Sequence, residues 1–120
     1  MRSTLENNTL TVFLENRIDT TNAGQVEQEI FEAVAAAPGA KVVLDARDLE
    51  YISSAGLRVL LKLKKQTPGE LPILHVSPIV NEILIATGFS KVLDVHPADP
   101  SAEVNNWASG NSTIEIVVGK

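Results

Sequence analysis

Residues 51–61 read YISSAGLRVLL, and they carry the chain out of a strand and its loop into a helix. Upstream, the short apolar run Lys41–Asp45 is typical of a strand buried on both faces of a parallel sheet. It is predicted to be the central strand, with residues 46–51 as the following loop. Downstream, leucines recur at helical spacing and predict a helix over about residues 54–66. A buried strand followed by an amphipathic helix is the building unit of an α/β domain.

The same alternation of strands and helices continues on both sides of this stretch. Asn7 and Asn8 favour a tight turn, which would join the first two strands as an antiparallel hairpin. Ser77 and Pro78 are typical of a helix start, and Gly88 suits the left-handed position after that helix. The further strands are predicted at residues 2–6, 9–14, 71–76 and 91–95, and the further helices at residues 20–37 and 78–87. With right-handed crossovers, these elements predict an α/β sandwich with a mixed, mostly parallel sheet of four to five strands and about four α-helices.

The size of the chain sets the number of domains. A length of 120 residues and a hydrophobic content of 44% fit one domain with its own core. We expect this domain at residues 1–100 and a C-terminal extension at residues 101–120. Residues 101–107 predict a weak helix, and Thr113–Val118 has strong strand propensity. That last segment could add to a sheet edge, pair between two chains of a homodimer, or fray.

Composition narrows the class of partner. The net charge of −5 and the absence of a long Lys/Arg run argue against a nucleic acid. No apolar run approaches the roughly 20 residues that cross a bilayer, and the first residues lack a signal-peptide core, so we expect a soluble cytoplasmic protein without a membrane partner. Because there is no cysteine and His75 and His96 are far apart in sequence, we expect no metal and no cofactor. These features favour a protein or small-molecule partner.

Two serines, Ser53 and Ser54, lie where the strand and its loop turn into the helix. Serine is a preferred N-cap, because its hydroxyl satisfies a free backbone N–H group at a helix start. A phosphate on such a serine would instead add about −1.5 to −2 charges against the positive end of the helix dipole. The residues alone favour the cap and leave the regulatory switch open.

Three segments are similar to the signature of the STAS family, which includes the bacterial anti-sigma-factor antagonists. The first is the stretch from Val42 to Leu57, the second is Glu15–Ala23, and the third runs from Val76 to Leu93. The resemblance covers about residues 9–97 and implies a single STAS-like domain. Two departures stand out, since many phosphorylated members have an acid where this chain has Ser53 and a glycine where it has Asn16.

The resemblance also implies a function and a partner. Ser54 aligns with the residue that is phosphorylated in antagonists, with Ser53 as the alternative hydroxyl. The unmodified protein would bind an anti-sigma factor, often a serine kinase of the histidine-kinase-like ATPase class, and so release a sigma factor. The same kinase would phosphorylate Ser54 and end the binding, and a serine phosphatase would restore the unmodified form.

The expected docking surface comprises the two loops that carry the resemblance and the exposed face of the second helix. Its expected residues are Asp19, Thr20, Ser53, Ser54, Gly56, Arg58 and Lys62. Asp19 matches a residue that lines the phosphorylation region in antagonists, although Asp19 or Thr20 could equally cap the first helix. Gly56 is expected to keep the backbone near Ser54 accessible. The basic stripe of Arg58, Lys62 and Lys65 is also typical of a simple solvated face.

Two other functions compete with this interpretation. Within the same family, the chain could be a scaffold or an accessory subunit of a transporter or signalling complex, with Ser54 never modified. A hydrolase would need Ser54 as nucleophile, His75 or His96 as base, and Asp19 or Asp45 as orienting acid. Because the sequence contains no G-x-S-x-G motif and no glycine-rich phosphate loop, we expect no enzymatic activity.

Overall fold

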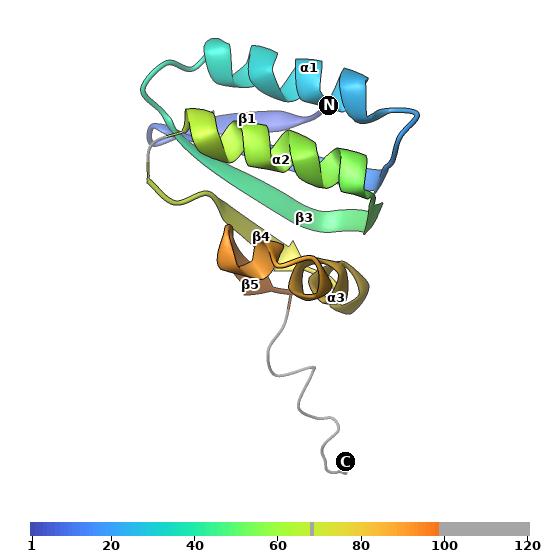
Figure 1. Ribbon diagram of the computed structural model, residues 1–120. Coiled ribbons are helices and arrows are strands. Elements are labelled where there is room, and N and C mark those ends of the chain that lie inside the picture. Colours follow the sequence, from blue (N-terminus) through green and yellow to red (C-terminus); the bar gives the residue numbers. More distant parts are fainter. Residues whose placement is uncertain (68, 99–120) are drawn as a thin grey trace.

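A computed structural model describes residues 1–67 and 69–98 of the chain (Figure 1). The strands are β1 (Ser3–Glu6), β2 (Thr9–Ile18), β3 (Lys41–Ile52), β4 (Pro72–Val76) and β5 (Asp94–Pro97), and the helices are α1 (Ala23–Ala35), α2 (Ser54–Gln66), α3 (Pro78–Ala86) and the 3₁₀ turn η1 (Phe89–Lys91). The predicted α/β domain is thus confirmed, with three α-helices in the described part of the chain. The weak helix predicted at residues 101–107 and the strand-prone segment Thr113–Val118 lie outside the described residues.

The sheet has the strand order β1-β2-β3-β4-β5, with β1 antiparallel to β2 and the other neighbouring pairs parallel. Each crossover leads to the next strand in the same direction, so right-handed connections place all three α-helices on one face of the sheet. In Figure 1, α2 crosses in front of the sheet, with α1 above it and α3 below it. The mixed sheet and the central position of β3 are confirmed. No helix among the described residues is long and apolar enough to span a membrane.

The core fills the space between this face of the sheet and the helices. Along β2, Leu10, Val12 and Leu14 are buried, whereas the intervening Thr11 and Phe13 are only half-buried. This alternation is expected of a strand with a helix layer on one side. The hairpin that starts the sheet is also confirmed, because Asn7 and Asn8 both have positive φ, as a two-residue turn requires.

β3 is much longer than predicted. The loop expected at residues 46–51 is wrong, because the strand continues to Ile52 and pairs with the second half of β2. β4 pairs with β3 only at Leu44 and Asp45, so the second half of β3 is not paired with β4. This half of the strand exposes three charged residues, Arg47, Asp48 and Glu50. Its sequence is therefore as polar as that of a loop.

Three other predicted boundaries shift. The second strand continues to Ile18 instead of ending at residue 14, because it stays paired with the second half of β3. The first helix covers Ala23–Ala35 rather than residues 20–37. The last strand covers Asp94–Pro97 rather than residues 91–95, because the chain first makes the 3₁₀ turn η1. Gly88 precedes this turn with a φ of 83°, which confirms the predicted left-handed position after α3.

Asn16, near the end of β2, has a φ of 59°. The register of β2 against β3 shifts on either side of it, between Phe13 and Glu15 and between Asn16 and Arg17. Asparagine is one of the few residues that adopt this left-handed conformation, and glycine adopts it more easily still. Asn16 therefore adopts a backbone conformation that a glycine would also adopt, and the irregularity lies two residues before the end of β2.

Candidate functional site

The two loops that carry the family resemblance meet at one edge of the sheet. β2 and β3 end side by side, with Ile18 paired to Ile52. The next residue, Ser53, donates its backbone N–H to the carbonyl oxygen of Ile18 at 2.8 Å. The Asp19 loop and the start of α2 are therefore fixed to each other, as carboxyl ends of neighbouring parallel strands should be.

The two serines have different environments. Ser53 is the N-cap of α2, with an extended backbone, and its Oγ accepts a hydrogen bond from the N–H of Gly56 at 3.3 Å. Ser54 is the first residue of the helix and is exposed. Within residues 1–67 and 69–98, no hydrogen bond engages its hydroxyl. The cap role expected of either serine thus falls to Ser53, and Ser54 presents a free hydroxyl.

This division predicts the effect of removing the cap. Ser53→Ala should destabilise the domain by about 1 kcal/mol, because it leaves a helix-terminal N–H without its acceptor. Thermal unfolding should show this as a loss of about 4–8 °C in Tm. Ser77→Ala removes the equivalent cap of α3, where Oγ accepts from the N–H of Val80 at 3.2 Å, and should cost a similar amount. Ser53→Asp keeps a hydrogen-bond acceptor at this position and should have a Tm close to that of the wild type. Equal Tm values for Ser53→Ala and the wild type would contradict the assignment of Ser53 as the cap of α2.

Asp19 is held rigidly in its loop. One oxygen of its carboxylate accepts hydrogen bonds from the hydroxyl of Thr21 at 2.6 Å and from the N–H of Thr21 at 3.0 Å. These two bonds, with smaller contributions from the backbone N–H of Asn22 and from Arg17, hold the pKa of the Asp19 carboxyl below its usual value. At neutral pH the loop therefore presents a fixed negative charge at the same sheet edge as Ser54.

The alternative in which the side chain of Asp19 or Thr20 caps α1 is wrong. Asn22 occupies the N-cap position, and its side chain bonds backward into the loop instead of to the helix. Its Oδ1 accepts from the N–H of Asp19 and its Nδ2 donates to the carbonyl of Arg17, both at 2.8 Å. Thr20 is exposed, so this loop is shaped by Asn22 and leaves Asp19 and Thr20 at the surface.

Gly56 is buried, so the expectation that it keeps the backbone near Ser54 accessible is wrong. A Cβ atom at this position would lie 2.7 Å from a side-chain carbon of Ile18 and 2.7 Å from one of Ile52. The glycine lets the first turn of α2 lie directly against the ends of β2 and β3. It therefore sets where Ser54 is presented.

The basic residues of α2 also differ from one another. Arg58, Lys62 and Lys65 are all exposed, as predicted. Lys62, however, contacts both carboxylate oxygens of Glu27 on α1, at 3.2 and 3.3 Å. Arg58 joins no ion pair with any residue that the structure describes. Of the two basic residues expected at the docking surface, Arg58 is the one with an uncompensated charge.

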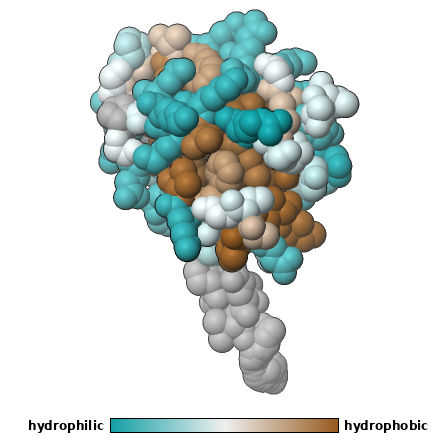
Figure 2. Space-filling model, viewed as in Figure 1, coloured by the Kyte–Doolittle hydropathy of each residue, from teal (hydrophilic) through white to brown (hydrophobic). Residues whose placement is uncertain are grey.

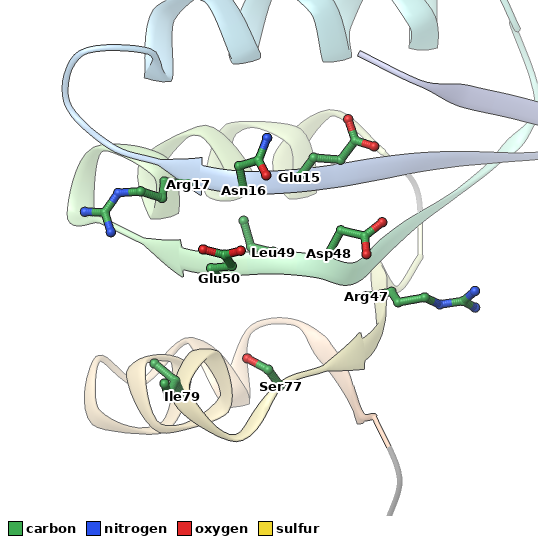
Figure 3. A pocket seen from close by; sticks show the side chains of 9 residues that line it. All are labelled: Glu15, Asn16, Arg17, Arg47, Asp48, Leu49, Glu50, Ser77 and Ile79. Atoms are coloured by element: carbon green, nitrogen blue, oxygen red, sulfur yellow. The ribbon is translucent and has the colours of Figure 1, made fainter.

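A shallow groove adjoins this edge, where the second half of β3 is not paired with β4 and the start of α3 lies beside it (Figure 3). It is lined by Glu15, Asn16, Arg17, Arg47, Asp48, Leu49, Glu50, Ser77 and Ile79. Arg17 lies over the ring of Tyr51, 4.7 Å from its centroid, and Ile79 at the start of α3 is 64% exposed. None of these three residues was predicted as a site residue from the sequence. The glycine-to-asparagine departure at Asn16 was the one available signal of the irregular strand that leads into Arg17.

Apolar side chains gather on the helix side of the molecule, between α2 and α3 (Figure 2). The large apolar residues left exposed in and after α3 are Ile79, Ile85 and Val92. Exposed apolar surface rimmed by polar residues is typical of a site of protein contact. Of these residues, Ile79 also lines the groove next to the sheet edge, so exposed apolar surface lies beside the ends of β2 and β3.

The arrangement that a hydrolase would need is not formed among the described residues. His75 contacts the buried carboxylate of Asp45 at 3.1 Å, and His96 contacts Asp94 at 3.0 Å. Neither histidine bonds to Ser54, so the serine has no base among the described residues. No group of three or more metal-ligating side chains occurs in this part of the chain either.

Comparisons with known proteins place these features in a family. Residues 2–102 match the family model of the STAS domain. BtrV of Bordetella bronchiseptica, assigned as an anti-sigma factor antagonist, is 39% identical over 85 residues, which cover 68% of this chain and 72% of the relative. The anti-sigma F factor antagonist of Paenibacillus polymyxa is 28% identical over 96 residues, or 78% of this chain and 82% of the relative. A crystal structure from Thermotoga maritima, assigned as an anti-sigma factor antagonist, has a TM-score of 0.72 at 17% identity, covers 85% of this chain and 88% of its own, and shows the same fold.

Proposed function

This chain belongs to the STAS domain family, and on that premise we propose that it is an anti-sigma factor antagonist whose binding is controlled at Ser54. One observation carries the proposal. At the edge where β2 and β3 end together, Ser53 caps α2 and Ser54 stands exposed with a free hydroxyl. The antagonist role of its relatives BtrV and the Paenibacillus polymyxa protein supports the choice of partner.

In the unmodified state the docking surface is formed by the Asp19 loop, Ser54 and the exposed face of α2. Its occupant is an anti-sigma factor, which releases its sigma factor when it binds this chain. We place this exchange in the cytoplasm, and we assign it to the STAS domain at residues 1–100, with residues 101–120 as an extension. Ion-pairing groups such as Arg58 would favour an acidic patch on the partner.

In the modified state an anti-sigma kinase has transferred the γ-phosphoryl group of ATP to Ser54. The bond from phosphorus to Ser54 Oγ forms, the bond to ADP breaks, and the hydroxyl proton leaves. The product carries about −1.5 to −2 charges at a surface where Asp19 is already ionised. Binding would then require burial of these like charges in the interface, which costs affinity without any refolding of the domain. Hydrolysis by a serine phosphatase restores the hydroxyl.

The antagonist function is tested by displacement. The purified chain is titrated into a preformed complex of the anti-sigma kinase and its sigma factor, with and without ATP. We expect sigma factor to be released in proportion to added chain, and ATP to suppress this release for the wild type but not for Ser54→Ala. A scaffold whose Ser54 is never modified would show no release, or a release that ATP leaves unchanged in both proteins.

A further inference from the structure

Ser54 and Arg58 lie one turn apart on the same face of α2. Ser54 is the first residue of the helix, Arg58 is four residues later, and both are exposed. Side chains at this spacing are neighbours on a helix surface and commonly form ion pairs when their charges are opposite. In the unmodified chain no such pair exists, because serine is neutral.

The guanidinium of Arg58 has no acidic partner to satisfy it. The first turn of α2 contains no acidic residue. Two other cations of this helix are already engaged, since Lys62 contacts Glu27 and Lys64 donates to the carbonyl of Gly69 at 2.9 Å, and Lys65 lies at the far end of the helix. Arg58 makes neither an ion pair nor a hydrogen bond to any residue in the described ranges. It is therefore the free cation nearest in sequence to the Ser54 hydroxyl on this helix.

A phosphate at Ser54 would give Arg58 an anionic partner one turn away on the same helix. Its three oxygens match the planar fork of a guanidinium, which binds phosphate through two parallel hydrogen bonds. The N–H of Gly56 and the N–H of Leu57 are both occupied, by the side chain and the carbonyl of Ser53 respectively. Among the side chains of the first turns of α2, a phosphate would therefore find its cationic donor in Arg58.

We propose that Arg58 is the intrachain partner of the phosphate on Ser54, and this inference rests on the proposed modification of Ser54. In the unmodified chain the guanidinium is free to contact an acidic group of the anti-sigma factor. After phosphorylation it is bound to the phosphate and withdrawn from the docking surface. The charge on this pair of residues changes from +1 to between about −0.5 and −1. The switch thus adds an anion and removes a cation in one step.

The test measures the second ionisation of the phosphate, which is near pH 6 in an unperturbed phosphoserine. Phosphoserine is installed at position 54 of the full chain during translation, and ³¹P NMR follows its titration. A neighbouring guanidinium stabilises the dianion and so lowers this pKa. We expect the pKa to be about 0.3–0.7 lower in the wild type than in Arg58→Gln, the range of an exposed ion pair. Arg58→Lys should fall between the two, because it keeps the charge but not the fork.

Lys65→Gln is the matched control, because it removes an exposed cation from the far end of the same helix. It should leave the phosphate pKa at the wild-type value. Equal values for the wild type and Arg58→Gln would overturn the inference. Because the phosphoserine is installed without a kinase, this outcome is distinct from failure of the proposed function, which would appear as a kinase that binds the chain and never modifies Ser54.

Discussion

Gly56→Ala is expected to destabilise the domain by about 1–2 kcal/mol, although alanine is the better helix former. A Cβ atom here would lie 2.7 Å from carbons of both Ile18 and Ile52, so the helix or these side chains must move. Overpacking of this kind costs about 1–3 kcal/mol, and the gain in helix propensity offsets at most about 1 kcal/mol. Urea or thermal unfolding measures the difference, with about 4–8 °C of Tm for each kcal/mol.

Gly24→Ala provides the matched control in α1. Apart from its chain neighbours and the backbone of its own helix, no atom lies within 4 Å of the Cβ that this substitution adds, so only the gain in helix propensity remains. Gly24→Ala should therefore stabilise the domain by up to about 1 kcal/mol. If glycine-to-alanine substitution lowers the stability at position 56 and raises it at position 24, the close contact of α2 with the ends of β2 and β3, and not helix propensity, requires the glycine at position 56. A Gly56→Ala protein as stable as the wild type would contradict the geometry that presents Ser54.

Ser54→Asp is expected to weaken binding to the anti-sigma factor at least about tenfold, which corresponds to 1.4 kcal/mol. The added carboxylate lies at the same sheet edge as the ionised Asp19, and burying both in an interface costs desolvation and repulsion. It also lies one turn from Arg58 and competes with the partner for that cation. Because aspartate carries one charge, phosphoserine at this position should weaken binding further.

Titration calorimetry against the anti-sigma factor measures this effect. Ser54→Ala removes the hydroxyl without adding charge and should bind within about threefold of the wild type, well under one kcal/mol. Ser53→Asp places the same charge one residue earlier, on the side chain that caps the helix, and should weaken binding less. A Ser54→Asp protein that binds as tightly as the wild type would count directly against control of docking at Ser54.

Most of the fold could be predicted from periodicity and turn residues. The hairpin at Asn7 and Asn8, the central strand and the helix that starts at Ser54 depend on local signals and were predicted correctly. The second half of β3 was not predictable in this way. It pairs with β2 alone and exposes Arg47, Asp48 and Glu50, so its sequence has the polarity of a loop.

The candidate site could be predicted only in part. The family pattern placed Asp19 and Ser54 together, which the joined ends of β2 and β3 explain. It could not decide which serine caps α2, because the two side chains are identical. The cap is Ser53 or Ser54 according to whether the helix begins at residue 54 or at residue 55. The role of Gly56 was missed for a related reason, since contact with Ile18 is a property of the folded chain and not of the local sequence.

The central claim is that Ser54, and not Ser53, is the modified residue. The purified chain is incubated with ATP and its anti-sigma kinase, and the added phosphate is located by peptide mass spectrometry in the wild type, Ser53→Ala and Ser54→Ala. We predict one phosphate on Ser54, which Ser53→Ala retains and Ser54→Ala loses. Phosphate on Ser53, or stable binding of the kinase with no phosphate on either serine, would contradict the claim and reduce Ser54 to an exposed residue of a scaffold.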